Sequence, residues 1–440
     1  MNEVQIEKLI FGGAGLGRLA DKRPVFVSKS LPDDLLDIEI TKSKKDFAEA
    51  KIIKVVKPSP IRQKPLCPYF EECGGCDYQN MNYENQLAQK SQIFAEVLAR
   101  AKVSTKILPI IAGSNAEFFY RNTNRYYFTH GTDGNLSLAM HHFNDAKKLI
   151  PIRRCSLLSE SSNNISASLL QYLNKFHFSD NPFSQIRFRE GKATGETMIE
   201  IFTSSKTLPS QEGIVEVLKK FPEVKSLYHS EISGDDLNSA RRRLIFGRPV
   251  IYEKIGKFTF QISPDSFFQT NSEGAKTLYD KIKFLTEIDP TDRILDLFCG
   301  TGTIGIYLST LTKEVLGVDI VQSAVNDAKA NTRLNKILNC QFMCADLSDL
   351  KQFKNLATKQ FTKIIFDPPR TGLNKDLIQE LCNLMNLKNL KLIYVSCNPS
   401  TFCRDAKLFE SLGVNLELVE PIDLFPQTQH IECVGVFRKQ

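Results

Sequence analysis

The sequence predicts an α/β protein whose last third, residues 263–440, is a doubly wound domain with a parallel sheet and a C-terminal antiparallel hairpin. In that third, short apolar runs such as RILDLFCG and KLIYVSCNP alternate with helical stretches, as is typical of parallel sheets. The last two apolar runs are separated only by PQTQ, which indicates a hairpin. Two units are expected before this domain: a small β-barrel over residues 1–58 and an α+β central domain over residues 62–262.

The barrel is predicted from several short apolar runs within the first 57 residues, with glycines at the turns between them. So many strands in so short a segment favour a closed barrel, because closure leaves no strand edge unpaired. A proline-bearing segment, residues 57–65, then ends this unit as a stiff linker.

The central region begins with a cysteine-bearing segment, residues 66–80. A helix is predicted over residues 83–101, where apolar residues recur at helical spacing, and we expect it to pack on the C-terminal domain. From about residue 117 to residue 260, strands and helices mix without regular alternation. An α+β arrangement is therefore expected there.

Residues that follow the strands of the C-terminal domain predict a ligand site, because ligands of open α/β sheets bind beyond the carboxyl ends of the strands. The first strand runs into a turn containing Gly300 and Gly302, where the backbone can approach a ligand closely. The second strand ends at Asp319, whose carboxylate can accept hydrogen bonds from ribose hydroxyls. A third glycine in the G-x-G-x-x-G register is absent from the sequence, which weakens a dinucleotide interpretation.

The D-x-F-x-G-x-G turn, with acids after the next three strands, resembles the S-adenosylmethionine site of Rossmann-like methyltransferases. This resemblance implies S-adenosylmethionine as the cofactor. The residues it implies as cofactor-binding are Gln269, Phe298, Gly300, Gly302, Thr303, Asp319, Asp346 and Asp367.

Two further motifs narrow the resemblance: Asp-Pro-Pro-Arg at residues 367–370 and Ser-Cys-Asn-Pro at residues 396–399. Together they resemble the RNA uracil-5 methyltransferases, which make 5-methyluridine. The resemblance spans nearly the whole chain and includes F-F-Q-x-N at residues 267–271 and an N-terminal barrel that looks like a TRAM domain, an OB-like RNA-binding barrel. It implies methyl transfer to carbon 5 of a uridine in RNA.

The chemistry accounts for the residue types. Carbon 5 of uracil is a poor nucleophile, so a thiolate first adds to carbon 6 and generates an enolate that takes the methyl group. Cys397 is the expected nucleophile, and Asn398 and Pro399 predict a helix that begins directly after it. The positive end of that helix is expected to lower the pKa of the thiol. The resemblance assigns proton removal to Glu432 of an H-x-E motif, and Asp367 is expected to orient the base or contact the cofactor.

Two rival reactions fit the motifs less well. Cytosine-5 RNA methyltransferases carry a second cysteine in the motif after the fourth strand, where this sequence has Asp-Pro-Pro-Arg. Enzymes that methylate amino groups have an aromatic residue after the two prolines, where Arg370 stands, and need no Ser-Cys-Asn-Pro. Uracil is therefore the predicted base.

Three clustered cysteines, Cys67, Cys73 and Cys76, have the spacing C-x5-C-x2-C, and Cys155 is the best fourth ligand. Four thiolates can hold either zinc or an iron–sulfur cluster, and the spacing does not choose between them. The family resemblance favours a [4Fe–4S] cluster, because one branch carries it at this motif. That branch also has the TRAM domain, and the transfer RNA branch lacks both features, so 23S ribosomal RNA is the expected substrate.

The RNA is expected to be single-stranded or looped, because carbon 6 is reached only after the uridine leaves its stack. Phe267 and Phe268 are candidates for stacking on it, although burial in the core is expected for one of them. The formal charge of +7 and basic groups such as residues 241–243 are compatible with binding to phosphates.

No apolar run is long enough to cross a membrane, and the N-terminus does not resemble a targeting segment. We therefore expect a cytoplasmic monomer. Two alternatives remain open: a transfer RNA uracil-5 methyltransferase, and a catalytically silent RNA-binding module that carries an iron–sulfur cluster.

Overall fold

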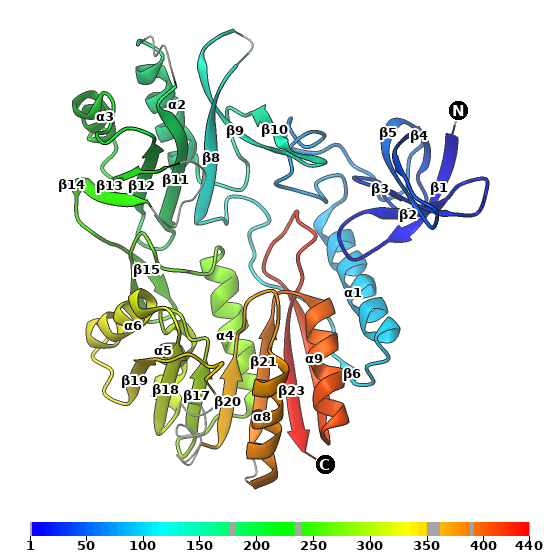
Figure 1. Cartoon of the computed structure of the whole chain (residues 1–440), viewed down its shortest axis with the longest axis vertical. Coiled ribbons are helices and arrows are strands. Elements are labelled where there is room, and N and C mark those ends of the chain that lie inside the picture. Colours follow the sequence, from blue (N-terminus) through cyan, green and yellow to red (C-terminus); the bar gives the residue numbers. More distant parts are fainter. Residues whose placement is uncertain are drawn as a thin grey trace.

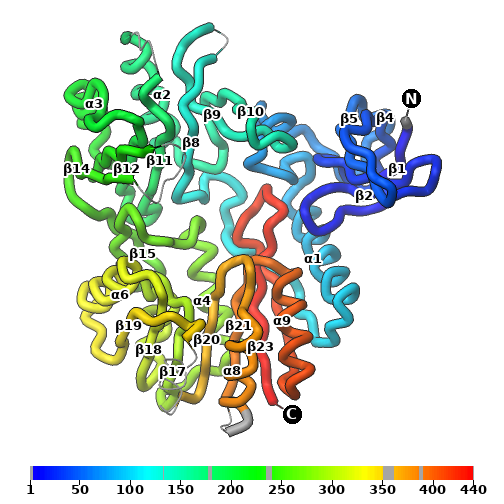
Figure 2. The backbone as a smooth tube through the Cα atoms, in the orientation of Figure 1, coloured from blue at the N-terminus to red at the C-terminus, as the bar shows by residue number. Residues whose placement is uncertain are grey.

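The computed structural model describes residues 2–131, 133–176, 181–233, 240–349, 361–387 and 390–439 of the 440-residue chain. Figure 1 shows an N-terminal barrel on one side, a mixed α/β part at the top and a larger sheet with helices below. The smooth backbone trace in Figure 2 shows that the last part of the chain, coloured yellow to red, forms most of the lower part. In the described residues, no helix is both long enough and apolar enough to cross a membrane.

The predicted barrel is confirmed. Five strands close in the order β1-β2-β3-β5-β4. Alternate residues such as Val4 and Ile6 point into its apolar core, as expected for strands with one buried face. The strands are β1 (Asn2–Leu9), β2 (Gly15–Arg18), β3 (Pro24–Val27), β4 (Leu35–Ser43) and β5 (Ala48–Lys57).

The central sheet has seven strands in the order β10-β9-β8-β11-β12-β13-β14, and it is antiparallel except between β12 and β13. Two helices, α2 (Glu160–Leu173) and α3 (Gln211–Leu218), pack on the apolar face of this sheet. The strands are β8 (Thr123–His130), β9 (Leu136–His142), β10 (Asp145–Pro151), β11 (Phe183–Gly191), β12 (Glu196–Thr203), β13 (Val224–Glu231) and β14 (Arg241–Gly247). A two-stranded sheet, β15 (Ile251–Ile255) with β16 (Phe258–Ile262), follows.

The C-terminal sheet confirms the predicted α/β class. Its order is β19-β18-β17-β20-β21-β23-β22-β6; the five strands from β19 to β21 are parallel, and the last two in the sequence form the expected hairpin. These strands are β17 (Arg293–Leu297), β18 (Glu314–Asp319), β19 (Cys340–Cys344), β20 (Lys363–Phe366), β21 (Lys391–Ser396), β22 (Val414–Asp423) and β23 (Glu432–Lys439).

Both faces of this sheet are covered, which is why its strands are continuously apolar. The helices are α1 (Tyr83–Arg100), α8 (Lys375–Leu387) and α9 (Pro399–Ser411) on one face, and α4 (Ser272–Thr286), α5 (Thr303–Leu308) and α6 (Gln322–Leu334) on the other, with a short 3-10 helix at Ser309–Leu311. Helix α1, from the expected central domain, packs against α9.

The predicted hairpin does not form the edge of the sheet, because two short strands lie beyond it. These are β6 (Lys106–Ile107) and β7 (Ile111–Ala112), and both pair in parallel with β22. The segment that contains α1, β6 and β7 thus belongs structurally to the C-terminal sheet. The domain boundaries predicted from the sequence, after residues 58 and 262, remain predictions.

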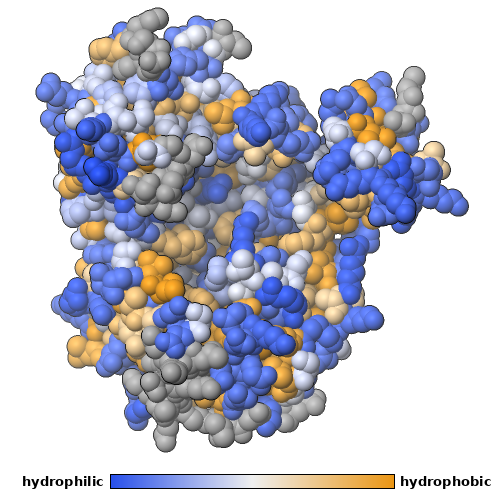
Figure 3. Space-filling view, viewed as in Figure 1, coloured by the Kyte–Doolittle hydropathy of each residue, from blue (hydrophilic) through white to orange (hydrophobic). Residues whose placement is uncertain are grey.

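The orientation of the sheet determines where a ligand could bind. Strand β23 runs towards the C-terminus at the bottom of Figure 1, and β21 is antiparallel to it. The carboxyl ends of the parallel strands therefore face upwards, towards the central sheet. Figure 3 shows that the surface is hollowed at this level, between the upper and lower halves of the molecule.

Candidate active site

Three residues of the glycine turn after β17 adopt the left-handed backbone conformation, which has a positive φ angle. Phe298, Gly300 and Gly302 have φ angles of 60°, 51° and 76°. At Gly302 a Cβ atom would also lie 2.6 Å from the ring of Phe342, so only glycine fits there. The amide of Gly300 donates a hydrogen bond of 2.9 Å to Oδ2 of Asp319. The turn and the predicted ribose-binding acid therefore lie side by side.

A cavity opens beside this turn. Phe298, Ile320, Asp346 and Pro369 lie in its wall, so three successive strand ends and the Asp-Pro-Pro-Arg motif meet there. The carboxylate of Asp346 is exposed and accepts hydrogen bonds from the amide and hydroxyl of Ser348, which lower its pKa. An apolar wall with an acid at its rim could hold a nucleoside.

Of the eight predicted cofactor residues, Phe298 and Asp346 line this cavity and the other six do not, among them Thr303 and Gln269. The hydroxyl of Thr303, at the start of α5, accepts a hydrogen bond of 2.8 Å from Tyr279. Gln269 is half-buried. Its backbone carbonyl oxygen accepts a hydrogen bond of 2.7 Å from the side-chain amide of Asn122. Both residues support the segments that surround the turn.

The predicted nucleophile lies where the sequence suggested, directly before a helix. Cys397 follows β21, and the side chain of Asn398 caps α9 by accepting a hydrogen bond of 3.1 Å from the amide of Ser400. Pro399 is the first helical residue, as predicted. The side chain of Cys397 is half-buried.

The expected lowering of the thiol pKa is wrong for the free chain. Burial raises the pKa of Cys397 to about 11, and the charges of Glu432 and Asp367 raise it as well. Arg370 lowers it, but by less. The helix N-terminus is therefore outweighed by loss of solvent and by two acids that its position in the sequence did not reveal.

These two acids lie close enough to the thiol for their charges to act on it. Glu432, the first residue of β23, is buried, and burial followed by the charge of Asp367 raises its pKa to about 8. Burial alone raises the pKa of Asp367 to about 7. Two carboxyls that exchange protons near neutral pH, next to a cysteine, are suited to acid–base and nucleophilic chemistry.

A cation borders this group. Arg370 lowers the pKa of both Cys397 and Glu432, and its guanidinium lies 3.4 Å from Nδ1 of His430. Burial, followed by Arg370, lowers the pKa of His430 to about 4, so the imidazole is neutral at physiological pH. The positive charge of Arg370 thus acts on two of the three predicted catalytic residues, Cys397 and Glu432.

The loop that leads into Glu432, residues 424–431, is held by contacts that the sequence did not reveal. Lys90 and Asp423 form an ion pair of 2.8 Å with both side chains fully buried. Gln86 and Gln427 exchange two hydrogen bonds of 2.9 Å. These partners are more than 300 positions apart, so no local pattern could have predicted them.

The four predicted metal-binding cysteines line one cavity, between segment 66–80 and the residues around Cys155. Burial, together with the charges of the other three cysteines, raises the pKa of Cys76 to about 12. Such mutual repulsion is what a bound cation would relieve. Among the described residues, however, no three side chains are already grouped as metal ligands.

The two predicted stacking residues differ as expected. Phe268 packs against Phe260 in the core, whereas the side chain of Phe267 is 65% exposed. Of the pair, only Phe267 can therefore meet a base.

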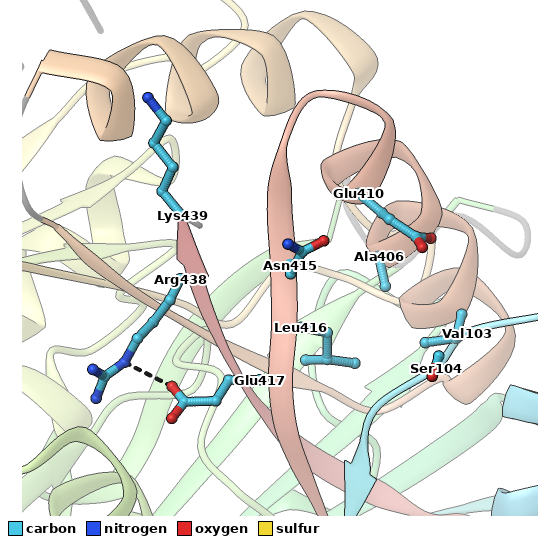
Figure 4. A pocket seen from close by; sticks show the side chains of 9 residues that line it. All are labelled: Val103, Ser104, Ala406, Glu410, Asn415, Leu416, Glu417, Arg438 and Lys439. Atoms are coloured by element: carbon cyan, nitrogen blue, oxygen red, sulfur yellow. Dashed lines mark ion pairs between the residues drawn. The ribbon is translucent and has the colours of Figure 1, made fainter.

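A second hollow lies at the far edge of the sheet, between α9, the hairpin and residues 103–104 (Figure 4). Its side chains include the ion pair of Arg438 with Glu417, 2.6 Å long. None of its described lining residues is a predicted site residue. The candidate active site is therefore the one at the carboxyl ends of the strands.

A glycine turn with an acid on the next strand, beside a cysteine and two carboxyls, defines an α/β enzyme of the methyltransferase class. Residues 82–440 match the family described as tRNA (Uracil-5-)-methyltransferase, and residues 2–53 match the TRAM domain. The chain belongs to this family of RNA uracil-5 methyltransferases.

Relatives agree over the full length. The chain is 31% identical to an uncharacterized RNA methyltransferase of Caldanaerobacter subterraneus subsp. tengcongensis, over 99% of this chain and 98% of the relative. An uncharacterized RNA methyltransferase of Bacillus cereus is 32% identical, over 98% of this chain and 95% of the relative. The crystal structure of Pyrococcus abyssi tRNA (uracil-54, C5)-methyltransferase in complex with S-adenosyl-L-homocysteine matches with a TM-score of 0.77 and 27% identity, over 99% of both chains.

Proposed function

We propose that this enzyme transfers a methyl group from S-adenosylmethionine to carbon 5 of a uridine in RNA through a covalent adduct with Cys397. The observation that carries the proposal is that Glu432 and Asp367 lie close enough to Cys397 for their charges to raise the pKa of its thiol, at the same end of the sheet as the glycine turn. A nucleophile and a base are the two groups that this reaction requires of the protein.

S-adenosylmethionine would be held by the turn at Gly300 and Gly302, by Asp319 through its ribose, and by the cavity wall that includes Phe298 and Asp346. When bound, it supplies an electrophilic methyl group. The Pyrococcus abyssi neighbour, which is in complex with S-adenosyl-L-homocysteine, supports this assignment.

In the proposed reaction, the sulfur of Cys397 forms a bond to carbon 6, and the electron pair of the 5,6 double bond moves to give the enolate. Because the pKa of the thiol is about 11, its proton has to be taken up as it attacks, and Asp367, with a pKa of about 7, is the proposed acceptor. Carbon 5 would then form a bond to the methyl group while the bond from that group to the sulfonium sulfur breaks, which would leave S-adenosylhomocysteine as the other product.

The reaction ends with elimination. Glu432 takes the proton from carbon 5, the 5,6 double bond re-forms, and the bond between sulfur and carbon 6 breaks. The thiolate recovers its proton from Asp367. A base with a pKa of about 8 is well matched to this task near neutral pH.

The cysteine cavity is proposed to hold a [4Fe–4S] cluster with Cys67, Cys73, Cys76 and Cys155 as ligands. Four thiols on one cavity are the donor set that such a cluster requires. A cluster there would link segment 66–80 covalently to Cys155, which follows the last strand of the hairpin β9–β10. Iron and sulfide analysis of anaerobically purified protein tests this, and a tetrahedral zinc site is the other outcome.

For the RNA, we propose 23S ribosomal RNA on the basis of the cysteine motif, since a transfer RNA enzyme also matches the chain over the barrel. A transfer RNA is the second candidate, because the full-length Pyrococcus abyssi neighbour is named as a transfer RNA enzyme. Mapping 5-methyluridine in both RNA classes from cells lacking the gene separates the two. A monomer acting in the cytoplasm remains our expectation.

The mechanism is tested with RNA that contains 5-fluorouridine, because fluorine at carbon 5 cannot be removed as a proton. Incubation with S-adenosylmethionine is expected to trap a covalent complex with the wild-type protein and none with Cys397→Ala. Cys403→Ala, a buried cysteine of α9, is the matched control and should still form the complex. If the wild-type protein forms no complex but still binds the RNA, the silent RNA-binding module is the better description.

A further inference from the structure

We propose that Asp77 is a positioning residue that fixes the loop of residues 424–431 and thereby aims Glu432 at its substrate. The inference deepens the proposed function and rests on it for the role of Glu432. Asp77 directly follows Cys76, in a segment that the methyl-transfer steps do not use.

Three hydrogen bonds join segment 66–80 to the loop. The amides of Asp77 and Tyr78 both donate to the carbonyl oxygen of Gln427, at 2.8 and 3.1 Å. In return, the amide of Gln429 donates to Oδ2 of Asp77 at 2.9 Å. Glu432 follows only three residues later, so these bonds fix the backbone immediately before the proposed base.

The carboxylate of Asp77 is the part of this junction that mutation can remove. The bonds to Gln427 are made by backbone amides and persist in any non-proline variant. The bond from Gln429 depends on the side chain, and a bond to a charged acceptor is among the stronger ones in a protein.

The same segment also contacts the barrel. The ammonium group of Lys29 donates to the carbonyl oxygens of Phe70, Cys73 and Cys76, the last two at 3.1 and 3.2 Å. On the barrel side, a Cβ atom at Gly13 would lie 3.1 Å from the Cβ atom of Gln429. In Figure 1 the loop at the top of β23 adjoins this blue segment. Segment 66–80 therefore bonds both to the barrel and to the loop before Glu432, and the carboxylate of Asp77 is a side-chain group that makes a bond to the loop.

Amide hydrogen exchange without RNA tests the positioning role directly. In Asp77→Ala, exchange at Gln429 and its neighbours in residues 424–431 is expected to be about tenfold faster than in the wild type, because a charge-assisted hydrogen bond is lost. kcat is expected to fall, while the KM for S-adenosylmethionine stays the same, because the glycine turn is untouched.

Two further variants make the result interpretable. Asp77→Asn keeps an oxygen acceptor of the same size but without the charge, so its exchange should lie between that of the wild type and that of Asp77→Ala, and it should keep most of kcat. Glu71→Ala removes an exposed acid of the same segment and should match the wild type in both measurements. If Asp77→Ala unfolds, the reduced acceptor strength of Asp77→Asn should still give a measurable rise in exchange confined to the loop.

Unchanged exchange at residues 424–431 in a folded Asp77→Ala protein would overturn the inference, as would equal exchange increases throughout the chain. A wild-type protein without methyltransferase activity would refute the proposed function instead. The exchange result would still decide whether Asp77 fixes the loop.

Discussion

The buried ion pair between Lys90 and Asp423 offers a quantitative test of how helix α1 supports the active site. Both side chains are fully buried, and Nζ of Lys90 lies 2.8 Å from Oδ1 of Asp423 and 3.2 Å from the carbonyl oxygen of Phe425. In Lys90→Met, the Asp423 carboxylate would stay buried without its cation. Breaking one side of such a pair typically costs about 3–5 kcal/mol.

We therefore expect Lys90→Met to lose about 3–5 kcal/mol of the free energy of unfolding. The double variant Lys90→Met with Asp423→Asn should lose less than Lys90→Met alone, because it removes both charges. Lys407→Met, which breaks an exposed ion pair with Glu410, is the control and should cost less than about 1 kcal/mol.

The assay is urea unfolding followed by circular dichroism, because the chain contains no Trp for fluorescence. The transition of the C-terminal sheet is the one to compare. A loss under about 1 kcal/mol for Lys90→Met, or a double variant less stable than that single variant, would refute the reasoning.

Three other predictions concern the site itself. Gly302→Ala should weaken S-adenosylmethionine binding at least tenfold by calorimetry, because its φ is 76° and a Cβ atom would lie 2.6 Å from Phe342; unchanged affinity would contradict this. Phe267→Ala should weaken RNA binding by about 1–3 kcal/mol in a filter-binding assay, whereas Phe284→Ala, which changes an even more exposed phenylalanine on α4, should not. The pKa of Glu432 is raised from 4.5 to about 8, so the folded protein holds a proton that the unfolded chain releases in this range. The free energy of unfolding should therefore fall as the pH rises from 4.5 to about 8. In urea titrations, Glu432→Gln should show a weaker dependence on pH.

The sequence predicted those parts of the site whose conformation depends only on residues that are close together in the chain. The turn at Gly300 and Gly302 and the helix cap at Asn398 depend on backbone conformation and on neighbouring residues. The alternation of strands and helices likewise predicted the parallel sheet, because crossover connections follow from that order.

Properties that depend on distant residues could not be predicted in this way. The pKa of Cys397 follows from burial and from Glu432 and Asp367, which come from other strands. The contact of Lys90 with Asp423 spans 333 positions. Strand β6 has only two residues, so it leaves no periodic pattern to detect.

The short strands β6 and β7 also bear on how the catalytic part could be isolated. They occupy the outer edge of β22, so a fragment that starts at residue 263 would expose backbone donors and acceptors along that edge. Such an edge readily recruits a strand from another molecule and promotes aggregation. During synthesis residues 106–112 leave the ribosome long before β22, so the edge has its partner as soon as it forms.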